Sequence, residues 1–335
     1  MLIYKITTVF NFLIYGQALA SLDDSNENKH TLYDLQDECT RDIKAKNEIS
    51  EWANNLPILK DQDDRNINHM KDLVAQHETN PMLSEDDIID HFQRILALPL
   101  QTVCHVGKWV ALNRWNKKGG STDGERYLCM DNFFEDIRKE KCIIYSFGIS
   151  DNYKFEEEMG SIGCTIHAYD PTVDLPSFPA KNVFFHKIGL SHYQGNMEMR
   201  ANHLENHLTE PLPVTTLNDA IKSNGHLEKE ITYLKVDIES SEIKAIPQWI
   251  QSGVLKNVRQ IGLELHTGKT FFDRSGQANA AKSLLKSISQ LHELGFRHIS
   301  YAPNLFVDKR QDHGMTYYTY IDIVLYKPYT SEEGA

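Results

Sequence analysis

Short apolar segments alternate with amphipathic ones through the second half of the chain. Apolar runs that end at glycine or a polar residue predict strands at 142–147, 165–169, 183–188, 231–236 and 258–265. Apolar residues at helical spacing predict helices at 153–160, 215–223, 240–252 and 277–294. Two more strands, 296–301 and 317–326, follow with only a polar loop between them.

This alternation predicts the class of fold. Strands that alternate with helices form a parallel sheet with helices on both faces. The last two strands have no helix between them, so we expect them to be antiparallel neighbours. The sequence therefore predicts an α/β fold whose sheet is mostly parallel with a C-terminal antiparallel strand.

The region before this pattern is polar and helical. Helices are predicted at 32–55 and 61–77, and Ser84-x-x-Asp87 resembles a capping box that starts a third helix before Pro99. Residues 21–100 hold 18 acidic and 8 basic side chains, whereas residues 101–335 hold 29 and 26. Most of the net charge of −12 therefore lies in an acidic helical stem over 21–100, ahead of a domain over 101–328 and a tail over 329–335. The acidic balance also argues against a nucleic-acid partner held by a diffuse basic surface.

The first twenty residues have the pattern of a targeting segment. Lys5 precedes an apolar run from Ile6 to Tyr15, and Ala18-Leu19-Ala20 follows. This order predicts a signal peptide over 1–20 that is cleaved after Ala20. The alternative is an uncleaved signal-anchor in the Golgi membrane. Either segment predicts a secreted or lumenal location, and no interior apolar run is long enough for a multi-span membrane protein.

Five cysteines follow the targeting segment: Cys39, Cys104, Cys129, Cys142 and Cys164. An oxidising compartment permits disulfides, and an odd number leaves at least one thiol outside an intramolecular pair. Cys104 and Cys129 flank a loop rich in glycine and lysine, so a disulfide between them is plausible. Cys142 and Cys164 begin two predicted neighbouring strands and are either a second pair or buried thiols.

Residues at the carboxyl ends of the predicted strands are the candidates for ligand binding, because ligands bind beyond these ends in open parallel sheets. Gly148 follows the first strand and lets the backbone approach a ligand closely. Asp170 follows the second strand, where a carboxylate can accept hydrogen bonds from ribose hydroxyls. The alternative is a turn glycine and a helix-capping aspartate.

The fourth and fifth strands add a group of ionisable residues. Asp237, Glu239 and Glu242 follow the fourth strand, and Glu264 and His266 close the fifth. We expect these side chains to meet in one crevice, where they can hold a cationic cofactor or deprotonate a nucleophile. Glu242 also suits the start of the next helix, where negative charge complements the helix dipole.

Three segments carry a resemblance to a known family. Residues 142–155 (CIIYSFGISDNYKF), 167–171 (HAYDP) and 234–242 (LKVDIESSE) resemble the FkbM-related methyltransferases, and among these the methyltransferase-like twenty-four group. The resemblance covers roughly two thirds of the chain. It implies a Rossmann-like class I methyltransferase domain over 101–328 that uses S-adenosylmethionine.

The resemblance also implies roles for individual residues. The cofactor would be bound by Ser146, Phe147, Gly148, Ser150, Asp170, Gly189 and Asp237. In that family pattern Gly148 approaches the methionine end, Asp170 holds the ribose, and Ile188 and Gly189 lie near the adenine. Asp237 and Glu239 face the methyl-transfer centre, and no residue is assigned to a metal. Independently of the resemblance, His266 is the leading candidate base because histidine titrates nearest neutral pH, with Asp237 or Glu239 as alternatives.

The sequence departs from the family pattern at two positions. The common G-x-G-x-G is reduced to Gly148-x-Ser150, and Ser240 stands where D-x-E-G has glycine. Neither departure removes the loop, but both put the catalytic competence of the domain in question.

The leading hypothesis is methyl transfer in the secretory pathway to a glycan or protein hydroxyl. One alternative is a Golgi glycosyltransferase, because Asp237-Ile238-Glu239 loosely resembles the acidic motif that holds Mn²⁺ and a nucleotide sugar. The other alternative is a non-catalytic binding protein with the same fold.

Overall fold

The computed structural model describes residues 57–98, 104, 106–111, 125–131, 133–175, 180–197, 211–303, 309–312 and 315–328. The chain divides into two units, Met1–Glu51 and Trp52–Ala335, and every described residue belongs to the second. The predicted signal peptide, the predicted helix at 32–55, Cys39 and the tail at 329–335 lie outside the described residues. None of the described helices combines the length and the apolar character of a membrane span.

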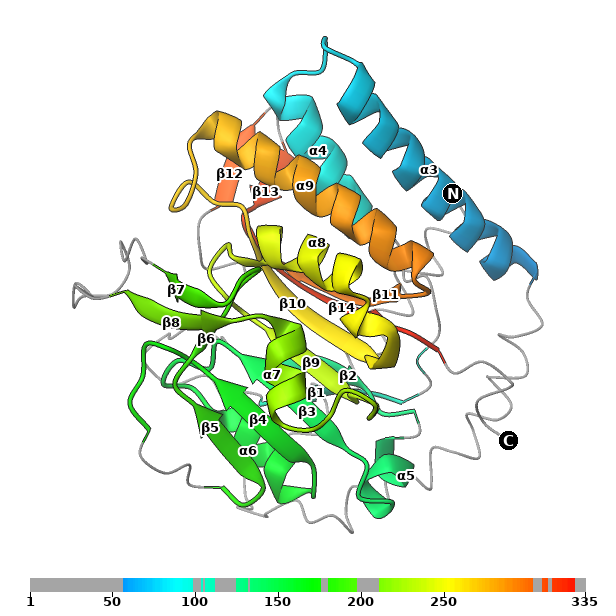
Figure 1. Cartoon of the computed structure of the whole chain (residues 1–335). Helices are drawn as coiled ribbons and strands as arrows, with labels where there is room; N and C mark the ends of the chain where they lie inside the picture. The colour runs from blue at the N-terminus through cyan, green and yellow to red at the C-terminus, as the bar shows by residue number, and fades with distance from the viewer. Residues whose placement is uncertain are drawn as a thin grey trace, which may run out of the picture. The chain divides into compact units, whose positions relative to one another are not determined.

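A seven-stranded sheet forms the centre of the second unit (Figure 1). Its strand order is β11 (Arg297–Pro303), β14 (Tyr320–Tyr326), β10 (Gln260–His266), β9 (Tyr233–Val236), β3 (Ile143–Phe147), β4 (Thr165–Tyr169) and β5 (Val183–His186). Strand β14 pairs antiparallel with both β10 and β11, and the other neighbours pair in parallel. The predicted α/β fold, mostly parallel with a C-terminal antiparallel strand, is confirmed.

Strand residues alternate between two hydrophobic clusters, one on each face of the sheet. Tyr145 and Leu234 belong to one cluster, and their neighbours Ile144 and Tyr233 belong to the other. Every residue of β3 and β10 is buried. Burial on both faces explains why these strands are continuous apolar runs in the sequence.

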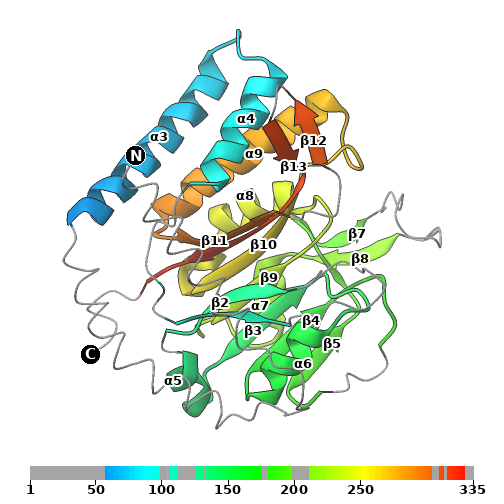
Figure 2. The same cartoon turned by 180° about the vertical axis from the view of Figure 1, so that it is seen from behind.

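Helices cover, in two layers, the face of the sheet to which Tyr145 and Leu234 contribute (Figures 1 and 2). Helices α7 (Leu217–Ser223), α8 (Glu242–Ser252) and α9 (Arg274–Glu293) supply residues to the cluster on that face. Helices α3 (Pro57–Thr79) and α4 (Glu85–Leu96) pack on α9. On the opposite face lie α5 (Phe133–Arg138), α6 (Lys154–Ser161) and the antiparallel pair β1 (Gly107–Val110) and β2 (Arg126–Cys129).

Helix α4 joins the acidic N-terminal region to the core of the sheet domain. Ser84 and Asp87 form the predicted capping box. Phe92 and Ile95 are buried in the same cluster as Leu284 of α9. The division of the chain at residue 100 stays a prediction, and the hydrophobic core is continuous across it.

Several short elements were not predicted. Strands β6 (Gly189–Leu190), β7 (Gly195–Met197) and β8 (Leu212–Thr215) form a small separate sheet, and η1 (Val254–Asn257) is a short 3₁₀ helix. The polar loop expected before the last strand contains a hairpin of β12 (Lys309–Asp312) and β13 (Met315–Tyr318). These strands are too short to show a hydrophobic period.

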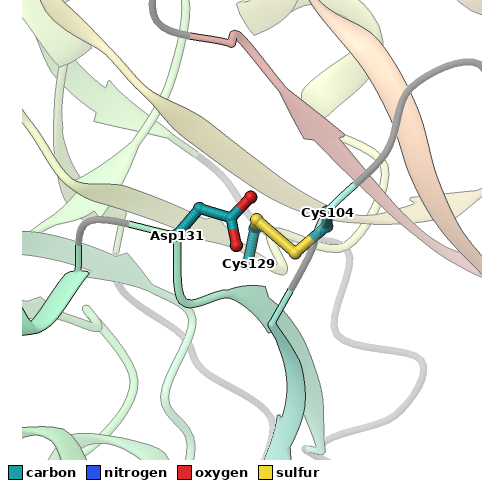
Figure 3. Close-up of side chains that lie close together, drawn as sticks. All are labelled: Cys104, Cys129 and Asp131. Atoms are coloured by element: carbon teal, nitrogen blue, oxygen red, sulfur yellow. A yellow bond between two sulfur atoms is a disulfide. The ribbon is translucent and has the colours of Figure 1, made fainter. Parts of the chain in front are cut away.

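Two disulfides lie in the described part of the chain. Cys104 pairs with Cys129 of β2, as predicted, and Cys142 pairs with Cys164, which decides between the two alternatives for these residues. Figure 3 shows the carboxylate of Asp131 beside the first disulfide, and this carboxylate accepts a hydrogen bond from the Val106 amide at 2.9 Å. Both disulfides are consistent with a secreted or lumenal protein.

The second disulfide ties the starts of β3 and β4 together across 22 residues. The double variant Cys142→Ser, Cys164→Ser is expected to lose about 3 kcal/mol of unfolding free energy, because the unfolded chain regains loop entropy. Urea unfolding measures this loss. Cys39→Ser, which leaves both pairs intact, is the control, and equal stability of the double variant and this control contradicts the prediction.

Two buried histidines, His292 at the end of α9 and His298 in β11, are held neutral. The His292 Nε2 atom lies 3.1 Å from His298 Nδ1. Burial lowers the pKa of His298 to about 4, and burial together with the nearby His298 and Arg297 lowers the pKa of His292 to about 2. In the unfolded chain both titrate near 6.5.

Acidification is therefore expected to destabilise the fold. Between pH 6.5 and 4 the unfolded chain takes up protons that the folded protein does not, so the stability present above pH 6.5 falls as the pH drops. Each such histidine contributes about 1.4 kcal/mol per pH unit. Unfolding free energies of His298→Gln should fall less steeply over this range than those of the wild type. The exposed His69→Gln should match the wild type, and equal slopes for all three proteins would refute this account.

Candidate functional site

The strands at the centre of the sheet end at the same level. Phe147 of β3 is in register with Tyr169 of β4 and Val236 of β9, so Gly148, Asp170 and Asp237 all follow directly at one edge. The chain runs outward from β3 to β4 and β5 and then returns to β9 on the other side of β3. This change of direction makes the edge beyond β3 and β9 the topological switch point, where ligands usually bind in such sheets.

Gly148 brings the ends of β3 and β9 into close contact. Its φ is +77°, and a Cβ on this residue would lie 1.6 Å from the Asp237 carbonyl oxygen. Only glycine tolerates both conditions. The Gly148 amide donates to Tyr169 at 2.9 Å and the Asp237 amide donates to Phe147 at 3.0 Å, so backbone hydrogen bonds continue past the strand ends.

A buried ion pair supports the glycine loop from below. Lys235 Nζ donates to the Gly148 carbonyl at 3.3 Å and lies 3.6 Å from Glu156 Oε1. The Ser146 hydroxyl donates to the same Glu156 oxygen. Ser146 and Phe147 are fully buried, so these two predicted binding residues lie beneath the loop. Lys235 and Glu156 were not among the predicted site residues.

Asp170 closes the neighbouring loop. Its Oδ2 accepts from the Ser150 amide at 2.9 Å, and its Oδ1 accepts from the Thr172 amide at 2.8 Å and the Thr172 hydroxyl at 2.6 Å. A carboxylate has about four acceptor positions, so one remains for a ligand. Gly189 lies nearby, because a Cβ there would be 3.1 Å from Pro171 Cγ.

Arg126 of β2 is the buried cation of the site. Its Nη2 lies 3.2 Å from both Asp237 Oδ2 and Glu264 Oε2, and its Nη1 lies 3.1 Å from Asp322 Oδ1. The side chain is only 2% exposed. Burial alone would lower the pKa of the guanidinium, but the three carboxylates outweigh this effect and raise it.

His266 lies at the end of β10 between three carboxylates. Glu242 of α8 accepts from the His266 amide at 2.7 Å and lies 3.2 Å from Nδ1. The Nε2 atom is 3.6 Å from Asp237 Oδ1 and 3.7 Å from Glu239 Oε2. Burial lowers the pKa of His266, but Glu242 and the other carboxylates outweigh it and raise the pKa to about 10.

The two acidic side chains that share the Nη2 atom of Arg126 have opposite pKa shifts. Burial opposes ionisation of Asp237, yet His266 and Arg126 keep its pKa below the ordinary value. Burial raises the pKa of Glu264 well above its ordinary value, and the charges of Asp237 and Asp322 raise it further. Asp237 is therefore the ionised member of the pair.

The five ionisable residues that were expected to converge lie close together in the structure. Asp237, Glu239 and Glu242 lie near His266, and Arg126 links Asp237 to Glu264. Sequence reasoning missed Arg126 and Asp322. Arg126 lies between Cys104 and Cys129, in the segment that the sequence indicated only as a loop rich in glycine and lysine. The available indication was the acidic cluster itself, because buried carboxylates require a cation.

Two groups in the described part of the chain bring three potential metal ligands together. Asp237, Glu239 and His266 form one group. Cys104, Cys129 and Asp131 form the other, but both sulfurs are in a disulfide and offer no thiolate (Figure 3). Of these two groups, only Asp237, Glu239 and His266 can offer all three of their side chains as metal ligands.

Comparison with known proteins gives a consistent result. A family model described as "Methyltransferase domain" matches residues 109–315. The chain is 27% identical over 195 residues to a human protein named "Probable methyltransferase-like protein 24", a match covering 54% of this chain and 51% of that protein. It is 28% identical over 196 residues to the rat protein of the same name, covering 54% and 52%. The matched part thus spans about half the length of these relatives, and no solved structure matches.

Loss of Arg126 is expected to leave three buried or partly buried carboxylates without their cation. Arg126→Ala should lower the free energy of unfolding by about 3–5 kcal/mol, the usual cost of breaking a buried ion pair from one side. Urea unfolding at neutral pH checks this. Arg138→Ala, at the exposed end of α5, is the matched control and should change stability by less than about 0.5 kcal/mol. A similar small loss in both variants would argue against the role of Arg126.

Proposed function

Because the chain belongs to the methyltransferase domain family whose model matches residues 109–315, we propose that it is an S-adenosylmethionine-dependent methyltransferase. Its acceptor is a hydroxyl group of a glycan or a protein in the secretory pathway. The observation that carries this proposal is the switch point at the carboxyl ends of β3 and β9, where Gly148, Asp170 and Asp237 follow three strands that end in register.

The residues at this edge suit the proposed cofactor. The Gly148 loop presents backbone without a side chain, and Asp170 keeps one acceptor position for a ribose hydroxyl. Ile188 and Gly189 lie beside the Asp170–Pro171 turn, on the side proposed for the adenine. Asp237 supplies negative charge where a sulfonium requires it.

Ser146, Phe147 and Ser150 have indirect parts in this proposal. Ser146 and Phe147 fix the end of β3 from the buried side, and the Ser150 amide ties the glycine loop to Asp170. The single serine in place of a second glycine adopts a φ of +48°, so the backbone keeps the left-handed turn that glycine usually provides.

S-adenosylmethionine supplies an electrophilic methyl group, and the protein contributes alignment and exclusion of water. A hydroxyl acceptor must also lose its proton. The raised pKa of His266 favours its protonated form, so Asp237 and Glu239 are better placed than His266 to accept that proton. The Glu239 side chain is half exposed, so an acceptor can reach it from solvent.

The location rests on separate observations. Two disulfides suit an oxidising compartment, and the predicted signal peptide would deliver the chain there. Family membership favours methyl transfer over the glycosyltransferase alternative.

Calorimetric titration with S-adenosylhomocysteine tests the proposal. The wild type should bind it, and Asp170→Asn should bind it about 10- to 100-fold more weakly, the cost of losing a charge-assisted hydrogen bond. Asp174→Asn is the matched control, because its side chain is 85% exposed and pairs only with Lys187 among the ion pairs described. Absence of binding by the folded wild type, or an equal loss in the two variants, would overturn the proposal.

A further inference from the structure

His266 directs one ring nitrogen at two carboxylates. Its Nε2 atom is 3.6 Å from Asp237 Oδ1 and 3.7 Å from Glu239 Oε2, and ligand atoms of the three residues lie within 4.8 Å of one another. A metal bound at about 2.0–2.2 Å in a tetrahedral site separates its ligands by about 3.3–3.6 Å. The three atoms therefore need only small shifts to share one metal ion.

Two of these ligands are already oriented by outer partners. Glu242 contacts His266 Nδ1 at 3.2 Å, which leaves Nε2 as the free coordinating atom. Arg126 holds Asp237 by Oδ2 at 3.2 Å, which leaves Oδ1 directed at His266. Carboxylate–histidine–metal arrangements and hydrogen-bonded carboxylate ligands are typical of protein metal sites.

The charge of the cluster points the same way. Around this space stand five carboxylates: Asp237, Glu239, Glu242, Glu264 and Asp322. Arg126 pairs with Asp237, Glu264 and Asp322, and His266 lies near Asp237, Glu239 and Glu242. The second oxygen of the fully buried Glu242 has no hydrogen-bond partner within the described structure. This unsatisfied oxygen belongs to the carboxylate that contacts the imidazole of His266, next to the ring nitrogen that a metal ion would bind.

We propose that Asp237, Glu239 and His266 bind a divalent cation of the Mn²⁺ or Zn²⁺ class. One imidazole with two carboxylates favours these ions over Ca²⁺ and Mg²⁺, which prefer all-oxygen ligands. The leading hypothesis from the sequence assigned no metal to these three residues.

The role of the cation rests on the proposed function. An ion at this position lies beside the end of β9, next to the proposed methyl-transfer centre. It would hold the acceptor hydroxyl and lower the pKa of that hydroxyl, so that its proton can pass to solvent water as the oxygen becomes the nucleophile. The acceptor class is then one whose hydroxyl can enter a metal coordination shell.

Titration of the full chain with Mn²⁺, followed by electron paramagnetic resonance of the free ion, tests the site directly. The wild type should remove one Mn²⁺ per chain from solution, and the bound ion should show nitrogen coupling from the imidazole. Glu239→Gln, at a half-exposed position that should not disturb folding, should weaken binding at least about 10-fold. His266→Gln should abolish the nitrogen coupling. Glu228→Gln, with a side chain 87% exposed, is the matched control.

Two outcomes overturn the site: no Mn²⁺ bound by the wild type up to millimolar concentration, or equal affinity in Glu239→Gln and Glu228→Gln. Titration of the same samples with S-adenosylhomocysteine separates this inference from the proposed function. Cofactor binding without Mn²⁺ binding contradicts only the metal site, whereas Mn²⁺ binding without cofactor binding contradicts only the methyltransferase proposal.

Discussion

The buried guanidinium of Arg126 is the interaction on which the candidate site depends. It joins β2 to carboxylates on β10 and β14 and to Asp237 just beyond β9, so one side chain connects four segments far apart in sequence. Carboxylates gathered at the edge of a buried sheet are costly without a cation. Gln260 reinforces the same contact, because its side chain exchanges two hydrogen bonds with the Cys129 backbone and clamps β2 onto β10.

The second constraint is the contact between Gly148 and Asp237. It brings the glycine loop of β3 and the acidic turn of β9 together, supported from below by Lys235 and Glu156. A ligand bound at this edge of the sheet would therefore meet both bare backbone and negative charge. This combination suits a cofactor with a positive reacting centre. The metal site inferred at Asp237, Glu239 and His266 would place the acceptor against the acidic turn that follows β9.

The sequence predicted the framework well, because buried strands leave long apolar runs. Strand β4 has the predicted bounds, and the residues expected to meet at the strand ends do so. The sequence did not predict contacts between residues that are far apart along the chain. Arg126 looked like part of a basic loop, since nothing local indicates that it faces Asp322, and the strand β2 that carries it has four residues. Ser146 followed the family pattern, but the alternation along β3 turns its side chain to Glu156.

The most direct measurement of the central claim is hydrogen–deuterium exchange with and without S-adenosylhomocysteine. Cofactor binding at the strand ends should slow exchange in peptides that contain the Gly148 loop, the Asp170 turn and residues 237–242, with no change in α3. Protection confined to other parts of the chain, or none at saturating ligand, would contradict it.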